Sequence, residues 1–120
     1  MHQTRVIATR TYEKRIAKLL PPEERAEMEN AVATEPERYP VVAGTKGVRK
    51  ARWSRPGMGK RGGVRLIYYF WVGPNAVVLI TAYAKNEKEN LTDADKKEIR
   101  KIVENLKHTN RAGEAFACGA

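Results

Sequence analysis

The sequence predicts an α+β fold in which helices cover one face of a mainly antiparallel sheet. Two observations favour this fold class. Apolar residues recur at helical spacing before and after a group of strand-like runs. Two of those runs are almost continuously apolar and are joined by the turn signal Gly73-Pro-Asn. The expected order is β-α-α-β-β-β-α in one domain over residues 1–120, with a core at about 5–107 and a flexible tail at 108–120.

The N-terminal part is predicted to hold one short strand and two antiparallel helices. The strand covers residues 5–8, and Thr9 or Thr11 can cap the helix that follows. The proline pair at 21–22 ends that helix and begins the next one. The second helix ends at Glu35, because the residue before a proline disfavours the helical conformation.

The C-terminal part is predicted to hold three strands and the last helix. The strands are expected at residues 48–53, 64–72 and 76–84. A loop rich in glycine and basic residues, 54–63, separates the first two of them. Thr92 begins the last helix, with Asp95 in the position of a capping box, and the apolar stripe of this helix continues to about Lys107.

All of the net charge is concentrated in residues 44–85. The chain has 23 Lys and Arg against 14 Asp and Glu, a formal charge of +9, and this segment contains no acidic residue. Its basic residues are Lys46, Arg49, Lys50, Arg52, Arg55, Lys60, Arg61, Arg65 and Lys85. Such a density of like charges opposes folding, so we expect it to serve a polyanionic partner. Nucleic acid, an anionic membrane surface and an acidic protein are the candidates.

The residues that several common chemistries require are absent. His2 and His108 lie near the termini, and no Cys/His ligand spacing occurs, so neither a metal nor a cofactor is expected. The glycines of 57–63 lack the spacing of a nucleotide-binding loop. Cys118 is the single cysteine, and no signal peptide or membrane-spanning run is found, so we expect a soluble cytoplasmic protein.

The remaining inventory of Lys, Arg and Tyr suits the cleavage of RNA by its own 2′-hydroxyl group. The protein must then remove a proton from the 2′-OH, stabilise the dianionic phosphorane and protonate the leaving 5′-oxygen. Arginine offers paired parallel donors to the phosphorane oxygens. Crowding by like charges lowers the pKa of a lysine, which can then exchange protons. DNA lacks the 2′-OH and would not be cut by this route.

Strand alternation predicts where such a site would assemble. Lys50 and Arg52 share one face of their strand. A register that sets Arg65 beside Tyr83 and Lys85 would join all five side chains in one concave, basic site. A shift of one residue would turn Arg65 to the opposite face.

Structural roles compete with these assignments. The basic strand face could simply be solvated, Tyr83 could be a core residue, and Lys85 could be a solubilising charge at a strand edge. Trp53 either caps the core or offers a platform for base stacking. The aromatic residues expected to pack in the core are Tyr68, Tyr69 and Trp71. Arg65 is the hardest to explain structurally, because it begins a long apolar strand directly after a Gly-Gly pair.

Three segments carry a resemblance to a known family. They are residues 47–53, 59–70 and 83–92, and their specific parts are the run Gly-Gly-x-Arg-x-Ile-Tyr-Tyr and the run Tyr-x-Lys-Asn-Glu. The chain resembles the RelE superfamily of type II toxins, closest to its HigB branch, from about residue 6 to 106. The resemblance implies a microbial-ribonuclease-like fold and a ribosome-dependent endoribonuclease, or mRNA interferase, that cleaves mRNA in the ribosomal A site and inhibits translation.

The resemblance also implies the partners of the chain. They are the 70S ribosome with its mRNA, and a cognate antitoxin encoded by the adjacent gene. That antitoxin is expected to bind DNA through a helix-turn-helix, so the toxin would reach operator DNA only indirectly. No membrane partner is implied.

The resemblance assigns roles to the catalytic candidates by position. Arg65 matches the strand arginine that stabilises the transferring phosphate, and Lys50 and Arg52 match a basic pair that handles substrate and protons. Lys60 matches a basic loop position, and Lys85 matches the lysine at the end of the last strand.

One departure leaves the general base open. RelE itself has a catalytic tyrosine near its C-terminus, whereas residues 90–94 here contain none. Either Tyr83 substitutes for it, or the reaction proceeds with Lys and Arg. The residues expected to contact RNA or the ribosome are Arg49, Arg55, Arg61, Lys46 and Trp53.

Two other functions remain compatible with the sequence. The first is a gyrase poison of the kind found in the ParE branch of the superfamily, which has no need of the basic catalytic set. The second is a non-catalytic RNA-binding module, in which alanine at Arg65 would weaken binding and abolish no cleavage.

Overall fold

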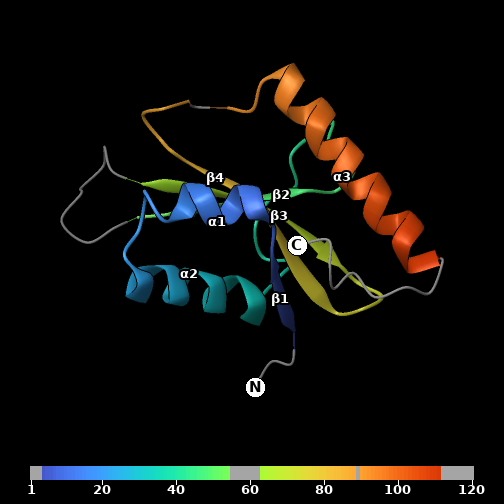
Figure 1. Cartoon of the computed structure of the whole chain (residues 1–120), viewed down its shortest axis with the longest axis horizontal. Helices are drawn as coiled ribbons and strands as arrows, with labels where there is room; N and C mark the ends of the chain where they lie inside the picture. The colour runs from blue at the N-terminus through green and yellow to red at the C-terminus, as the bar shows by residue number, and fades with distance from the viewer. Residues whose placement is uncertain (1–3, 55–62, 89, 112–120) are drawn as a thin grey trace.

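A computed structural model describes residues 4–54, 63–88 and 90–111 of the chain. Within these residues, three helices and four strands follow the predicted order β-α-α-β-β-β-α (Figure 1). They are β1 (Arg5–Ala8), α1 (Arg10–Ile16), α2 (Pro22–Thr34), β2 (Arg49–Trp53), β3 (Val64–Trp71), β4 (Ala76–Ala84) and α3 (Asp93–Arg111). The α+β fold class is therefore confirmed.

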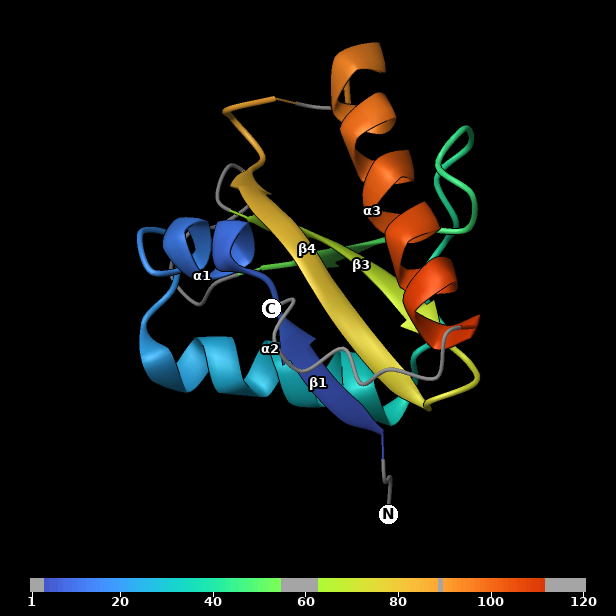
Figure 2. The ribbon, with the colours of Figure 1, turned by 45° about the vertical axis from the view of Figure 1, so that its right-hand side comes forward.

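The four strands form one mixed sheet with the order β1-β4-β3-β2. β2 and β4 both run antiparallel to β3, and β1 runs parallel to β4. β1 is short, and its last residue, Ala8, lies opposite Leu79 in the middle of β4. Among the described residues, no strand pairs with the outer side of the second half of β4, and α1 lies beside it instead (Figure 2).

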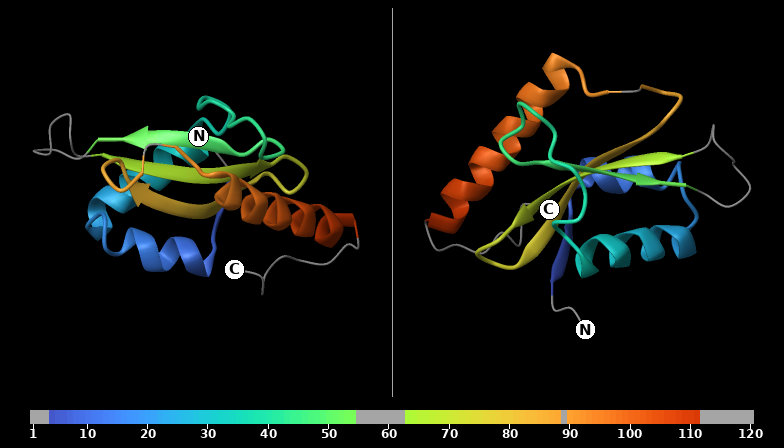
Figure 3. Two further views of the ribbon diagram at one scale, coloured as in Figure 1. Left: turned by 90° about the horizontal axis from the view of Figure 1, so that it is seen from above. Right: turned by 180° about the vertical axis from the view of Figure 1, so that it is seen from behind.

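Helices cover both faces of the sheet, which corrects the prediction that they cover one. Leu66 and Tyr68 of β3 belong to the core under α1 and α2, whereas Ile67 belongs to the core under α3. The views from above and behind show the sheet between these two layers (Figure 3). The physical reason is that β3 and β4 are apolar on both faces, so each face needs a cover. The amphipathic stripe of α3 supplies the second one, through residues such as Ile99 and Val103.

The predicted signals at the starts of the helices are confirmed, but α1 ends at Ile16, before it reaches the proline pair that was expected to end it. Thr9 caps α1 by accepting a hydrogen bond from the Tyr12 amide, and α2 begins with its proline in the first turn. Thr92 and Asp95 form the capping box of α3, each side chain binding the other residue's backbone amide. α3 continues to Arg111, beyond the predicted end, and the last nine residues of the chain lie outside the described part.

A polar network joins α1 to α2. The Tyr12 hydroxyl donates to Glu29 Oε2 at 2.7 Å, and Arg25 forms ion pairs with Glu13 at 3.0 Å and Glu29 at 2.7 Å. The Arg25 guanidinium also lies 5.2 Å from the centre of the Tyr12 ring. Burial and the neighbouring Glu29 carboxylate raise the pKa of Tyr12, so its hydroxyl remains a donor. The network thus joins α2 to α1, the helix that contacts β4.

Candidate functional site

The sheet register brings Arg52, Arg65 and Tyr83 into one row across three strands. Arg52 lies opposite Arg65 in the β2–β3 pair, and Arg65 lies opposite Tyr83 in the β3–β4 pair. Residues directly opposite each other point to the same face of a sheet. The predicted alignment of Arg65 with Tyr83 is thus confirmed, and all three side chains lie on the face that α3 covers.

A β-bulge in β4 produces this alignment. The register shifts halfway along the β3–β4 pair, where β4 contains one extra residue, Ile80. If the register set at the hairpin turn continued without the bulge, Arg65 would lie opposite Ala82, and Tyr83 would point to the other face. A bulge turns the side chains beyond it to the opposite face of the sheet. Here it places Tyr83 on the same face as Arg65.

Lys50 and Lys85 lie on the same face of the sheet as the row, one on either side of it. Lys50 lies opposite Ile67, whose side chain is in the core under α3. The Lys85 amide donates to the Gly63 carbonyl at 2.9 Å, so the ladder continues one pair beyond β4 and sets Lys85 opposite Gly63. The structure therefore places Lys50 and Lys85 on the face of the row. Of the remaining basic candidates, Lys60, Arg55 and Arg61 lie outside the described residues.

Arg65 is buried although it carries a charge, with 8% of its surface exposed. Its guanidinium lies beside Gly63, where a Cβ atom would be in ordinary contact with Arg65 Nη1 at 3.5 Å. The backbone of Gly63 has φ +155°, a value that side-chain-bearing residues rarely adopt. Gly63 thus has a structural reason: its backbone adopts a conformation that favours glycine, directly beside the guanidinium of Arg65.

Tyr83 is also buried, with 2% of its surface exposed. Its hydroxyl oxygen has no hydrogen-bond partner among the described residues. Burial raises the pKa of the phenol; nearby Asp95 adds to the rise, whereas Arg65 and Arg52 oppose it. The phenol therefore holds its proton at neutral pH, which favours a core role for Tyr83 over that of a general base.

Three residues expected to contact RNA or the ribosome are engaged elsewhere. Arg49 donates to the carbonyls of Glu37 at 3.1 Å and Tyr39 at 2.7 Å, and Trp53 packs against the core under α1 and α2. Both lie on the face opposite Arg65, because they alternate with Lys50 and Arg52 along β2. Lys46, in the loop before β2, forms an ion pair with Glu104 of α3. The packing expected for Tyr68 and Trp71 is confirmed, since both are buried.

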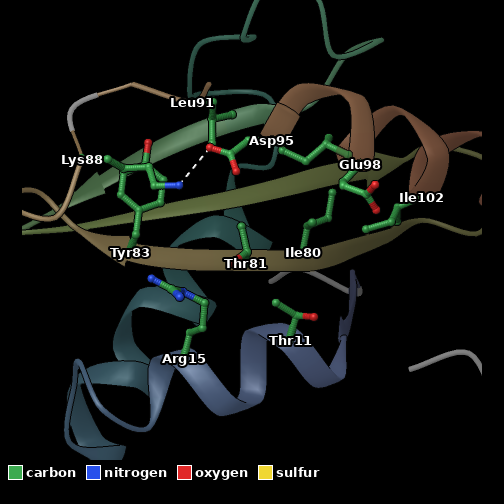
Figure 4. Close-up of a pocket in the computed structure, with 11 residues that line it drawn as sticks. Thr11, Arg15, Ile80, Thr81, Tyr83, Lys88, Leu91, Asp95, Glu98 and Ile102 are labelled. Carbon is green, nitrogen blue, oxygen red and sulfur yellow. Dashed lines mark hydrogen bonds and ion pairs between the residues drawn. The ribbon is translucent and has the colours of Figure 1, made fainter. Parts of the chain in front are cut away.

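The segment between β4 and α3 contributes polar residues that sequence reasoning missed. Lys88 Nζ lies 2.8 Å from Asp95 Oδ2 and 5.6 Å from the centre of the Tyr83 ring. Asp95 therefore combines the capping of α3 with an ion pair beside Tyr83 (Figure 4). On the other side of the segment, Glu87 forms an ion pair with Arg15 of α1. The only signal in the sequence was the glutamate within the run Tyr-x-Lys-Asn-Glu.

A cavity of about 340 Å³ lies beside this segment. Its floor is β4, and its walls come from α1 and α3 (Figure 4). The charged residues that line it are Arg15, Lys88, Asp95 and Glu98. Since two of these carry each sign, the cavity has no excess of positive charge, unlike the row on β2, β3 and β4.

Two negative findings apply to the described residues. No three His, Cys, Asp or Glu side chains lie together as the ligands of a metal ion would. No helix in this part of the chain is both long and apolar enough to cross a membrane.

The sequence matches a known family over nearly its whole length. The family is described as the RelE toxin of the RelE / RelB toxin-antitoxin system, and its model matches residues 4–114 of the 120. The matched part includes every described helix and strand and all of the candidate site residues.

Proposed function

The chain belongs to the RelE toxin family, and from this premise we propose that it is a ribosome-dependent endoribonuclease that cleaves mRNA in the A site. Membership of the family makes it the toxin of a type II toxin–antitoxin system and implies a cognate antitoxin. Assignment to the HigB branch, cleavage of mRNA in the A site and the ribosome as a partner belong to the proposal.

The observation that carries the proposal is the row formed by Arg52, Arg65 and Tyr83. Two guanidinium-bearing residues lie directly opposite each other at the end of a rigid sheet, and one of them is almost fully buried. A guanidinium held in this way meets the oxygens of a phosphorane with paired donors and little reorganisation. A gyrase poison or a passive binding surface would not require a buried arginine at this position.

Each residue then has a role in the reaction. Arg65 stabilises the charge that develops on the transferring phosphate. Lys50, Arg52, Lys60 and Lys85 bind the substrate and handle the proton of the 2′-OH and the proton for the leaving 5′-oxygen.

Dependence on the ribosome follows from the lack of an efficient general base among these residues. The proposed site contains neither a histidine nor a carboxylate as the general base, so free RNA should be cut slowly. A partner that holds the 2′-OH in line with the phosphate can lower the barrier by about 7–11 kcal/mol at best. The ribosomal A site would supply that orientation, and contacts with ribosomal RNA phosphates would make binding weaken steeply with salt.

Expression in a sensitive host tests the proposal. We would compare growth and the ends of a reporter mRNA, mapped by primer extension, for the wild type, Arg65→Ala, Arg65→Lys and Arg38→Ala. Arg38 is a matched control, because it is an arginine on the surface whose ion pair with Glu35 lies at the end of α2.

We expect growth arrest and new in-frame mRNA ends for the wild type and for Arg38→Ala. Arg65→Ala should lose at least about 100-fold in cleavage, and Arg65→Lys should recover little, because an ammonium lacks the paired donors. Arrest without new mRNA ends would favour a gyrase or binding poison instead. Arrest by Arg65→Ala with unchanged cleavage would remove Arg65 from the site.

A further inference from the structure

The outer edge of β4 is completed by two side chains instead of a strand. β1 ends opposite Leu79, and beyond that point Arg15 Nε donates to the Ala82 carbonyl at 2.5 Å. The Ala84 amide donates to Glu87 Oε1 at 3.4 Å. Arg15 Nη2 and Glu87 Oε2 form an ion pair with each other. Arg15 and Glu87, which we call the edge clamp, thus present a donor and an acceptor to alternate residues of β4, as a neighbouring strand would.

The edge clamp also closes the turn that contains Lys85. The Glu87 amide donates to the Ala84 carbonyl at 2.9 Å, while the Glu87 carboxylate accepts from the Ala84 amide. Both backbone polar groups of Ala84 are therefore bound by one residue. The Lys85 amide is held by the Gly63 carbonyl, directly beside the start of β3.

Arg15 connects this turn to the body of the protein. It reaches from α1 to β4 (Figure 4), and α1 is itself fixed to α2 by the network around Tyr12. On the other side, the ion pair of Lys88 with Asp95 ties the same segment to α3. The hydrogen bond from Arg15 lowers the pKa of Glu87, which keeps the carboxylate charged in the neutral range.

We propose that Arg15 and Glu87 are positioning residues, which fix the backbone of Lys85 so that this lysine stays on the face of Arg65. The inference rests on the proposed function for what Lys85 does there. The two side chains are 38% and 42% exposed, and an ion pair at that exposure adds little to global stability. A misplacement of about 1 Å in a catalytic group can nevertheless cost about 100-fold in rate.

Single-turnover cleavage of ribosome-bound mRNA provides the first test. We expect Glu87→Ala and Arg15→Ala to lower the rate by about 10- to 100-fold while the half-saturating toxin concentration and the melting temperature change little. Glu87→Gln should lose less, because its amide oxygen can still accept from the Ala84 amide. Glu35→Ala, which breaks the exposed ion pair with Arg38, is the control and should leave the rate unchanged.

A double-mutant cycle with Lys85 distinguishes positioning from a general defect. If the edge clamp acts through Lys85, Glu87→Ala should lower the rate no further once Lys85→Ala is present. An equal loss in both backgrounds would overturn the proposal, because Glu87 would then act independently of Lys85.

Amide hydrogen exchange tests the clamp without any assay of cleavage. Glu87→Ala and Arg15→Ala should speed exchange at the amides of residues 84–88, and Glu35→Ala should not. Unchanged exchange at these amides would overturn the proposal. If the wild type cleaves no ribosome-bound mRNA, the proposed function fails, and the exchange result alone decides whether the edge clamp holds the turn.

Discussion

Replacing Tyr83 with phenylalanine removes one hydroxyl group from the middle of the proposed site and leaves the ring in place. The ring packs in the core under α3, and Lys88 lies over it. The hydroxyl oxygen is buried and has no hydrogen-bond partner among the described residues. The substitution therefore removes a polar atom from the core and breaks no hydrogen bond within that part of the chain.

The expected change in stability follows from this burial. A buried polar group without a partner costs about 1–3 kcal/mol, so we expect Tyr83→Phe to be neutral or to stabilise the fold by up to about 1 kcal/mol. For a domain of this size, that corresponds to a rise of roughly 4 °C in Tm. The phenol has a raised pKa in the folded state, so the wild type loses stability as the pH rises above the ordinary value of 10.0. The variant should lose less of its stability in that alkaline range.

The effect on cleavage decides whether Tyr83 is a core residue or the general base. A general base contributes about 100- to 10,000-fold to the rate. Because burial holds the proton on Tyr83, we expect the single-turnover rate of Tyr83→Phe to stay within about threefold of the wild-type rate, measured beside its unfolding curve. A loss of 100-fold in a variant of unchanged or greater stability would refute this reasoning and make Tyr83 the proton-transfer group.

Two further substitutions test the surroundings of the row. Gly63→Ala forces an alanine into φ +155°, a conformation that residues with side chains rarely adopt. Because the strained backbone adjoins Arg65, we expect a loss of about 1 kcal/mol in unfolding experiments and a cleavage rate at least about tenfold lower. An unaffected rate would show that the backbone conformation of Gly63 does not position Arg65. Asp95→Asn removes a carboxylate whose pKa is held below 3.8, first by Lys88 and then by the Thr92 amide. The charged carboxylate stabilises the fold at pH values above its ordinary pKa, and this stabilisation is lost as the pH falls through its lowered pKa. The stability of Asp95→Asn should therefore fall less steeply with pH than that of the wild type below about pH 4. Identical curves of stability against pH would contradict the ion pair of Asp95 with Lys88.

The order of the elements and the starts of the helices could be predicted because the signals are local, whereas the ends of α1 and α3 were placed wrongly. The proline pair at 21–22, the capping box of Thr92 and Asp95, and the hairpin turn before Ala76 each act within a few residues. The alignment of Arg65 with Tyr83 was also predicted, but the bulge at Ile80 that produces it was not. A bulge depends on how two strands pack, and the continuous apolar run of β4 gives no sign of it.

The position of α3 and the edge clamp could not be predicted for a different reason. An amphipathic stripe shows which side of α3 is buried, but it does not show which face of the sheet it meets. The contact of Arg15 with Glu87 joins residues that are 72 positions apart in the sequence, and neither lies on an apolar pattern. Buried Arg65, by contrast, stood out in the sequence, because it is a charge inside an otherwise apolar strand.

The central claim is that the substrate's own 2′-hydroxyl attacks the phosphate at the Arg65 site. The most direct test is cleavage, on purified ribosomes, of an mRNA in which the nucleotide before the cleaved bond carries a 2′-deoxyribose, beside the unmodified mRNA. We predict that the wild type cuts the unmodified mRNA to a 2′,3′-cyclic phosphate end and leaves the 2′-deoxy mRNA intact. Equal cutting of both would contradict the mechanism, and inhibition of translation without cutting of either would contradict the assignment as a ribonuclease.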